Sequence, residues 1–384
     1  MGLFAVNIST DNWLEKSLKT EFLNMKNEAL AMVFSEAEKP FHPLPVDLPL
    51  LSSGEALVEI TYTTICTSDL HTFYGRRGAP TPSVLGHEVI GRIAILPENG
   101  VEDFYGEHLK VGDLVTWSVY AHDHAGAMAC KGIPQKSTPL FKYGHERIER
   151  NDVLSGGFAT HCHLRKGTDI FKIPEGITAK EAAPLNCTHA TVAGAIRLAG
   201  DLSGKNVLVI GAGMLGIAAC AMAKYAEAKH VFAMDLDGRR AENSKRFGAT
   251  TAIDAKLSSE EILQIIQPLG GIDVVIDTSG SAAAMEKGLA ILNIGGISVW
   301  VGAVYSERNI SLNAETVVRR ILTIKGLHNY TPEDLSYAIK FLKATHLTYP
   351  FASLVETDLP LSKLDEAFKV ANESGNYRVG ITPN

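Results

Sequence analysis

The 384-residue chain lacks the features that mark membrane, secreted or nucleic-acid-binding proteins. Its apolar stretches are broken well before the ~20 residues that a membrane-spanning helix needs. The net charge is -7, and neither sign forms a long run, which argues against a nucleic-acid or membrane partner. Five widely spaced cysteines, an odd number, do not form a disulfide framework. The first 32 residues have neither the apolar core of a secretion signal nor the acid-free composition of a transit peptide. We therefore expect a cytoplasmic protein.

The length predicts two domains, and the sequence shows no internal repeat. Residues 55–174 contain short β-branched runs bounded by glycine, aspartate and proline, which is typical of a β-rich domain. From about Cys187 to Gly326, apolar strands alternate with amphipathic helices, which indicates α/β units around a parallel sheet. The tail predicts helices over 332–343 and 361–372 and a strand over 377–381, and we expect it to rejoin the first domain. The predicted division is an N-terminal extension (1–32), a first domain (33–185 with 329–384) and a second domain (186–328). Residues 14–34 show some helical periodicity.

A glycine-rich motif follows the apolar run Val207-Leu-Val-Ile210 and opens an alanine-rich helix. The motif, Gly211-Ala-Gly213-Met214-Leu215-Gly216, lies in the strand–turn–helix context of a dinucleotide-binding fingerprint. The first glycine permits the tight turn, the second lets the backbone approach a pyrophosphate, and the third allows close helix–strand packing. A turn in an ordinary α/β protein is the alternative interpretation.

Asp235 ends the next predicted strand, at the spacing expected for a carboxylate on the adenosine ribose. It favours NAD over NADP, because it would repel a 2′-phosphate. Arg239 and Arg240 weaken this preference, since a nearby arginine accommodates that phosphate.

Three residues far apart in the sequence form a candidate zinc set. Cys66 opens Cys66-Thr-Ser68-Asp-Leu-His71, His87 lies in Gly86-His-Glu88, and Cys187 lies in Pro184-Leu-Asn-Cys-Thr-His189. Two thiolates and an imidazole leave the fourth position of a tetrahedral zinc open. Asp69 and Glu88 are candidates to orient the ligating imidazole or the metal water, and Glu88 is also retained as a possible ligand. Each residue alone is more often structural.

These segments together resemble the zinc-dependent medium-chain dehydrogenase/reductase superfamily, and the alcohol dehydrogenases in particular. The resemblance covers the chain from about residue 55 to 383. It implies a β-rich GroES-like catalytic domain, split in sequence around a Rossmann coenzyme domain, with zinc on Cys66, His87 and Cys187. It further implies that Ser68 holds the substrate hydroxyl, that His71 ends a proton relay through the nicotinamide ribose, and that Arg378 contacts the pyrophosphate. Dimers through edge strands of the coenzyme domain, where residues 297–304 are expected, or tetramers are also implied.

Many relatives carry a second, structural zinc on four cysteines, after the segment that corresponds to Gly112-Asp-Leu-Val115. Here that stretch retains Cys130 alone, so we expect one catalytic zinc per chain and no four-thiolate site. His122, His124 and Cys130 offer a different metal site, although two solvated loop histidines are the simpler interpretation.

A finer resemblance points to a branch associated with phosphonate catabolism. It rests on Leu70-His-Thr-Phe-Tyr-Gly-Arg-Arg77, Pro82-Ser-Val-Leu-Gly-His-Glu88 and Lys142-Tyr-Gly-His-Glu146. Arg76 or Arg77 could grip a carboxylate or phosphonate, although two solvated loop arginines are the simpler interpretation.

The activity implied is hydride transfer between a small alcohol, its aldehyde or ketone, and NAD. Two alternatives remain open: a metal-free quinone or enoyl reductase of the same fold, and a non-catalytic NAD-binding protein.

Overall fold

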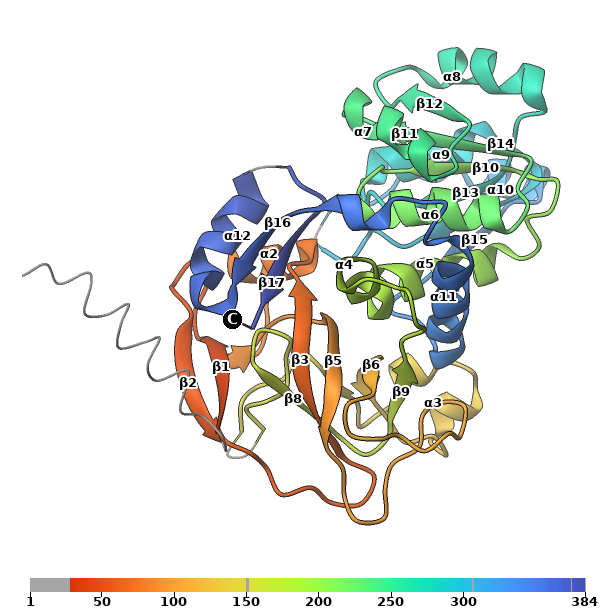
Figure 1. Ribbon diagram of the computed structural model, residues 1–384. Helices are drawn as coiled ribbons and strands as arrows, with labels where there is room; N and C mark the ends of the chain where they lie inside the picture. Colours follow the sequence, from red (N-terminus) through yellow and green to blue (C-terminus); the bar gives the residue numbers. More distant parts are fainter. Residues whose placement is uncertain (1–27, 150–151, 306, 374, 384) are drawn as a thin grey trace, which may run out of the picture.

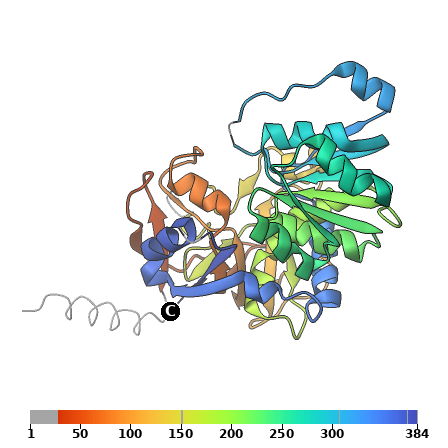
Figure 2. The same ribbon diagram turned by 90° about the horizontal axis from the view of Figure 1, so that it is seen from above.

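The computed structural model describes residues 28–149, 152–305, 307–373 and 375–383. Figure 1 shows a β-rich part, built from the N-terminal half and the C-terminal tail, beside an α/β part built from the middle of the chain. Figure 2 shows the same two parts side by side from above. Among the residues described, every helix is too short or too polar to cross a bilayer.

The α/β part is a six-stranded parallel sheet with helices packed on it. Its order is β12 (Thr251–Asp254), β11 (His230–Asp235), β10 (Asn206–Ile210), β13 (Ile272–Asp277), β14 (Leu292–Trp300) and β15 (Thr323–Gly326). The helices are α5 (Thr188–Ala199), α6 (Met214–Tyr225), α7 (Gly238–Asn243), α8 (Ser259–Ile266), α9 (Ala282–Ile291) and α10 (Ala314–Arg320). All five residues of β10 are buried, because helices cover both faces of the sheet. This order is that of the Rossmann fold, which binds nucleotides where the strand order reverses, here between β10 and β13.

The expected position of an edge strand at residues 297–304 was wrong. Residues 297–300 belong to β14, which pairs with β13 on one side and with β15 on the other. The edges of this sheet are β12 and β15. Strand β15 was not predicted, because its sequence, Thr323-Ile-Lys-Gly326, is too short to give an alternating pattern.

The β-rich part contains a large mixed sheet and a small one. The large sheet has the order β16 (Val355–Pro360), β17 (Arg378–Thr382), β3 (Ala56–Thr64), β5 (Glu88–Ile95), β6 (Leu114–Ala121) and β7 (Phe141–Lys142), while β8 (His161–Leu164) pairs with β3 and β9 (Thr168–Lys172) with β6. The small sheet has the order β2 (His42–Asp47), β1 (Glu28–Phe34) and β4 (Ser83–Val84). Short helices α2 (Thr67–Phe73), α3 (Ala127–Cys130) and α4 (Ala179–Ala182) connect these strands. An aromatic cluster of Phe34, Phe41, Phe73, Phe158 and Phe368 fills part of its core.

The N-terminal periodicity was misinterpreted over its last seven residues. Glu28–Phe34 is strand β1, antiparallel to β2 and β4, instead of the end of a helix. Residues 14–27 of that expectation lie outside the described residues. The predicted limit at residue 32 falls inside β1, and the domain limits stay predictions.

The C-terminal tail forms the elements expected from its sequence. Helix α11 (Pro332–Thr345) begins with a capping box in which Thr331 and Asp334 cap each other's backbone N–H groups, and α12 (Leu364–Glu373) follows. Strand β17 then pairs antiparallel with β3, with Gly380 opposite Thr64. This pairing carries Arg378, at the start of β17, to the end of β3, where Cys66 lies two residues further along the chain.

Candidate active site

Cys66, His87 and Cys187 come together where three segments end. Cys66 caps the N-terminus of α2, His87 precedes β5, and Cys187 precedes α5. One potential donor atom from each lies within 4.8 Å of those of the other two. Two soft sulfurs and one imidazole suit zinc, and three protein ligands leave a coordination position open. The donor set therefore fits a catalytic zinc.

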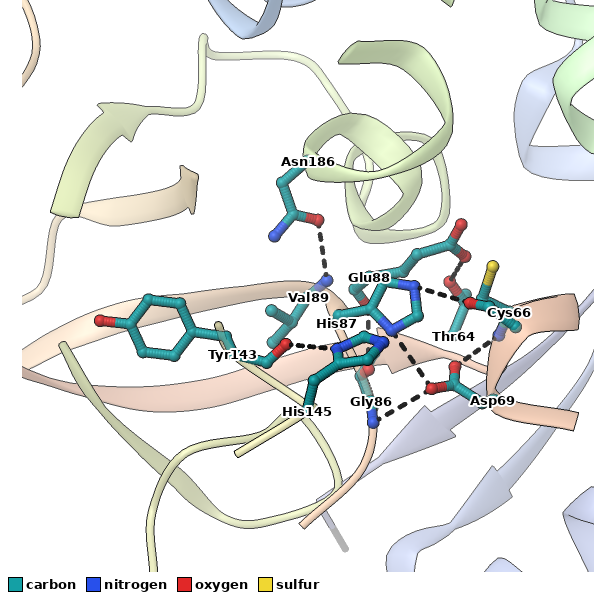
Figure 3. A network of polar contacts seen from close by, with 12 residues as sticks. Thr64, Cys66, Asp69, Gly86, His87, Glu88, Val89, Tyr143, His145 and Asn186 are labelled. Atoms are coloured by element: carbon teal, nitrogen blue, oxygen red, sulfur yellow. Dashed lines mark hydrogen bonds and ion pairs between the residues drawn. The ribbon is translucent and has the colours of Figure 1, made fainter. Parts of the chain in front are cut away.

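Asp69 orients the imidazole of His87. Its Oδ1 lies 3.2 Å from Nδ1 of His87, and the same carboxylate accepts the backbone N–H groups of Cys66 (2.9 Å) and Gly86 (3.3 Å). Figure 3 shows the carboxylate between these partners. Burial lowers the pKa of His87, but Asp69 and Cys66 outweigh burial and raise it to about 10. Of the two orienting residues suggested by the sequence, Asp69 is the one that contacts His87, and a metal must displace a proton from this ring.

Glu88 is not among the clustered donors, which corrects its inclusion with the metal ligands. Its carboxylate accepts both Nε and a terminal nitrogen of Arg378, at 2.6 and 2.7 Å. It also accepts the hydroxyls of Thr64 (2.6 Å) and Thr188 (2.9 Å). Each carboxylate oxygen thus already accepts two hydrogen bonds. Glu88 therefore influences the site through Arg378, whose guanidinium lies 3.5 Å from the Cys66 sulfur.

The two thiols differ in their readiness to ionise. A hydrogen bond from Cys187 and the charge of Arg378 hold the pKa of Cys66 well below its usual value, against burial and the charge of Glu88. The partner thiol, Cys187, keeps its proton more strongly because Cys66 and burial raise its pKa. Cys66 is therefore the more readily ionised of the two thiols.

Ser68 and His71 both lie on α2 and line the same cavity as the three donors. Ser68 Oγ is 3.1 Å from Nε2 of His87. The ring of His71 lies 5.3 Å from that of Tyr305, and its Nδ1 is buried with no hydrogen-bond partner among the described residues. Burial and the nearby Arg76 lower the pKa of His71, so it is neutral and able to accept a proton at pH 7.

The glycine loop follows β10 and reaches the same cavity. Gly211 has a φ of +89°, which favours glycine, and a Cβ at Gly216 would overlap the carbonyl of Gly211. A Cβ at Gly213 would meet nothing within 4 Å, so this backbone is open to an approaching ligand. Helix α6 begins here without a side-chain cap, and Met214 and Leu215 line the cavity. Free N–H groups at this helix N-terminus suit a pyrophosphate.

Asp235 and Arg240 also line the cavity, and Asp235 lies beside the glycine loop. Asp235 accepts the backbone N–H groups of Ala212 (2.6 Å) and Asp237 (2.8 Å), which fixes its carboxylate beside the glycine loop. Arg240 donates to the carbonyl of Gly375 and packs over the ring of Tyr377. Arg239 is 93% exposed and paired with Asp237.

The cavity has a volume of about 410 Å³ and contains basic residues that carried no assigned role in the sequence. Lys142, His145 and His328 line it, together with Arg77. No sequence spacing connects Lys142 with His328, which are brought together by β7 and by the segment after β15. In the sequence, the motif Lys142-Tyr-Gly-His145 indicated only Lys142 and His145, and nothing indicated His328. Arg76 instead donates to Asn372 (2.9 Å).

Comparison with known proteins agrees with this site. Residues 52–175 match the model of the alcohol dehydrogenase GroES-like domain, and residues 215–344 match that of the zinc-binding dehydrogenase. The L-threonine 3-dehydrogenase of Photorhabdus laumondii is 30% identical over 76% of this chain and 82% of its own length. The sorbitol dehydrogenase of Halalkalibacterium halodurans is 26% identical over 91% of this chain and 96% of its own. A solved alcohol dehydrogenase of Thermotoga maritima superposes with a TM-score of 0.87 at 25% identity, covering 93% of this chain and 100% of that one. The chain belongs to the zinc-dependent medium-chain dehydrogenase/reductase superfamily and is an oxidoreductase of the alcohol dehydrogenase type.

Proposed function

We propose that the protein transfers a hydride between NAD and a small alcohol that carries a negatively charged group, or the corresponding aldehyde or ketone. The observation that carries this proposal is that one cavity is lined by the zinc donors, the glycine loop and the basic side chains of Arg77 and Lys142. A metal-free reductase would have no use for Cys66, His87 and Cys187 as a cluster.

The chemistry is divided between the bound groups and the chain. Zinc on the three donors would supply a Lewis acid for the substrate oxygen, and NAD would accept or return the hydride. The chain supplies the proton path: Ser68 Oγ would exchange the hydroxyl proton of the substrate, and His71, one helical turn further along α2, would pass it toward solvent. The lowered pKa of His71 keeps its ring neutral at pH 7, so that a ring nitrogen is available to accept that proton.

Asp235 supports NAD as the nucleotide. Its carboxylate is held in place beside the glycine loop by two backbone N–H groups, where it would accept the ribose hydroxyls of a bound nucleotide and repel a 2′-phosphate. Arg239 is already paired with Asp237, and Arg240 donates to the carbonyl of Gly375, so a 2′-phosphate would compete with these contacts for part of each guanidinium.

Away from Asp235 the cavity is lined by the positively charged side chains of Arg77 and Lys142, which supports an anionic substrate. Arg77, Lys142, His145 and His328 line it, and among the described residues that line it Asp235 is the one carboxylate. Burial and Arg77 lower the pKa of Lys142 to about 8, and burial with Lys142 lowers that of His328 to about 4. Burial is the main cause of both shifts and nearby positive charges add to it, so an anion bound here would stabilise the charged form of Lys142.

The proposal is tested with hydroxyalkyl phosphonates, hydroxycarboxylates and neutral diols of matched length, following NADH absorbance with the zinc-loaded enzyme. We expect kcat/KM to be highest for anionic substrates and to be higher with NAD than with NADP. Equal kcat/KM for charged and neutral substrates would remove the argument from charge, and preference for NADP would remove the role given to Asp235.

A further inference from the structure

Three side chains outside the catalytic cavity meet at the end of β6. His122 directly follows this strand, His124 lies two residues further along the loop, and Asp169 lies on β9, which pairs with β6. One potential donor atom from each lies within 4.8 Å of the other two. Nε2 of His124 is 3.0 Å from Oδ1 of Asp169, and Nδ1 of His122 is 3.8 Å from Oδ2. Two ligands of one tetrahedral zinc lie about 3.3 Å apart when each is about 2.0 Å from the ion. The observed separations bracket that value.

Two atoms of this cluster are buried without a hydrogen-bond partner in the structure. They are Nδ1 of His122 and Oδ2 of Asp169, whose residues are only 7% and 8% exposed. A buried polar atom that lacks a partner costs about 1–3 kcal/mol, and more when it is charged. The two atoms face each other at a distance too long for a hydrogen bond and suited to a shared cation.

Hydrogen bonds hold the main chain of two of the three residues in place before any ion binds. The N–H of His122 donates to the carbonyl of Gly167 (3.0 Å), and the N–H of Asp169 donates to Ser118 Oγ (3.2 Å). The ring of Tyr120 packs edge-on against His122 at 5.5 Å. The imidazole of His124 is 58% exposed, so solvent reaches one side of the cluster and can complete the coordination.

We propose that His122, His124 and Asp169 bind a second divalent cation, for which two imidazoles and a carboxylate favour zinc. This donor set differs from the His122, His124 and Cys130 combination suggested by the sequence. The Cys130 thiol is exposed and donates to the carbonyl of Ala125 (3.6 Å). The expectation of one zinc per chain changes accordingly to two, the second without thiolate ligands.

The position of the ion suits it to a structural role in the loop that follows β6. The last residues of β6, Tyr120 and Ala121, pair with Lys142 and Phe141 of β7, so residues 122–140 form a loop that leaves and returns at this point. A cation on His122, His124 and Asp169 ties the first turn of that loop to β9. It would stabilise the loop by linkage, because it binds the folded arrangement alone.

The experiment counts ions per chain. The purified full-length protein is equilibrated with excess free zinc, desalted and measured by elemental mass spectrometry. We expect two ions in the wild type, one in His124→Ala and one in Asp169→Asn. Matched controls are His108→Ala, another exposed histidine next to a carboxylate, and Cys130→Ser, both with two ions. One ion in the wild type, or two in His124→Ala, would overturn the proposal, and loss of the second ion in Cys130→Ser would overturn this donor set.

A second measurement is independent of the ion count and of activity. With the cavity site already loaded, added zinc should raise the unfolding temperature of the wild type and of His108→Ala, but not of His124→Ala. Cobalt bound at the second site should add ligand-field absorption without thiolate charge-transfer bands, because no sulfur ligates it. A second cobalt that adds thiolate bands would place the ion elsewhere. If Asp169→Asn fails to fold, His124→Ala alone is enough for both measurements. The His124 side chain is mostly exposed, so its removal should leave the fold intact.

Discussion

Glu88 and Arg378 form a buried ion pair directly behind Cys66, and it joins the last strand of the chain to the strand that starts at the zinc site. Both contacts are short, 2.6 and 2.7 Å, and the two side chains are 0% and 4% exposed. The guanidinium of Arg378 lies between the Glu88 carboxylate and the Cys66 sulfur. Arg378 therefore both links two strands of the β-rich part and stabilises the negative charge of the Cys66 thiolate. Arg378 also lines the cavity, which leaves room for the pyrophosphate contact implied by the family.

Replacing Glu88 by Gln should therefore destabilise the protein strongly. Removal of one partner from a buried pair leaves an uncompensated charge and costs about 3–5 kcal/mol of unfolding free energy. Urea unfolding of wild type and Glu88→Gln, both saturated with zinc, measures this cost. The double variant Glu88→Gln/Arg378→Met should recover part of it, because it removes the buried charge. A double variant less stable than Glu88→Gln would contradict this explanation.

The same pair predicts how stability changes in acid. Burial raises the pKa of Glu88, but Arg378 outweighs burial and holds it at about 2, below the usual 4.5. The stabilisation is therefore present above pH 4.5 and lost as the pH falls toward 2. The acid unfolding curve of Glu88→Gln should lose less stability over this window than that of the wild type. Parallel curves for the two proteins would show that the pair does not titrate in this way.

Asp69→Asn should weaken zinc binding while preserving the fold. Asp69 Oδ2 accepts the N–H of Cys66, while Oδ1 faces the N–H of Gly86 and Nδ1 of His87, so the single amide oxygen of Asn can keep the shorter bond to Cys66 but the charge beside His87 is gone. Loss of such an orienting carboxylate typically costs 10–100-fold in metal affinity. Competition with a chromophoric chelator measures the zinc Kd. The conservative variant Asp69→Glu serves as a control that keeps the charge, and an unchanged Kd in Asp69→Asn would show that orientation of His87 does not depend on it.

The cofactor loop could be predicted from the sequence far more completely than the substrate site. The roles of Gly211, Gly213 and Gly216 could be predicted because the spacing of these glycines is set within one local strand–turn–helix unit. Cys66, His87 and Cys187 were recognisable by resemblance, although only folding brings them within reach of each other. The basic residues that line the cavity could not be predicted as a group, because Lys142 and His328 reach it from segments far apart in sequence. Strand β1 was missed because Glu28–Phe34 is buried along nearly its whole length, so it lacks the alternation typical of a half-buried strand.

Ser68→Ala should reduce kcat by about 10²–10⁴-fold, the usual contribution of a positioned proton-transfer group. Its zinc content should stay at the wild-type value, since Ser68 is not a ligand in the clustered set. Ser68→Thr, which keeps a hydroxyl, should retain most of the activity if its extra methyl fits. Steady-state kinetics with metal analysis separates these effects. A kcat for Ser68→Ala within threefold of the wild type would rule out the proton role.

Arg77→Ala should raise KM for anionic substrates and leave neutral ones nearly unchanged. A hydrogen bond to a charged group contributes about 1.5–3 kcal/mol, which corresponds to a change of roughly tenfold or more. Arg76→Ala is the matched control, because its guanidinium contacts Asn372 outside the cavity lining, and its effect on the pKa of His71 should change the kinetics of charged and neutral substrates alike. Both variants remove one positive charge from the same loop. Equal effects of the two variants would mean that overall charge, and not a direct contact by Arg77, attracts the substrate.

Lys142 gives the substrate site a pH dependence whose sign is fixed by its surroundings. Burial and Arg77 lower its pKa from 10.5 to about 8, so its charge is present below pH 8 and lost above it. The kcat/KM for an anionic substrate should therefore fall as the pH rises through about 8, because this ratio reports the free enzyme. A hydroxysulfonate is the best probe, since its own charge does not change in this range. Lys142→Arg should flatten the fall, because a guanidinium stays charged, whereas Lys142→Met should give the low value at every pH. A profile for Lys142→Met that still falls near pH 8 would assign the titration to another group.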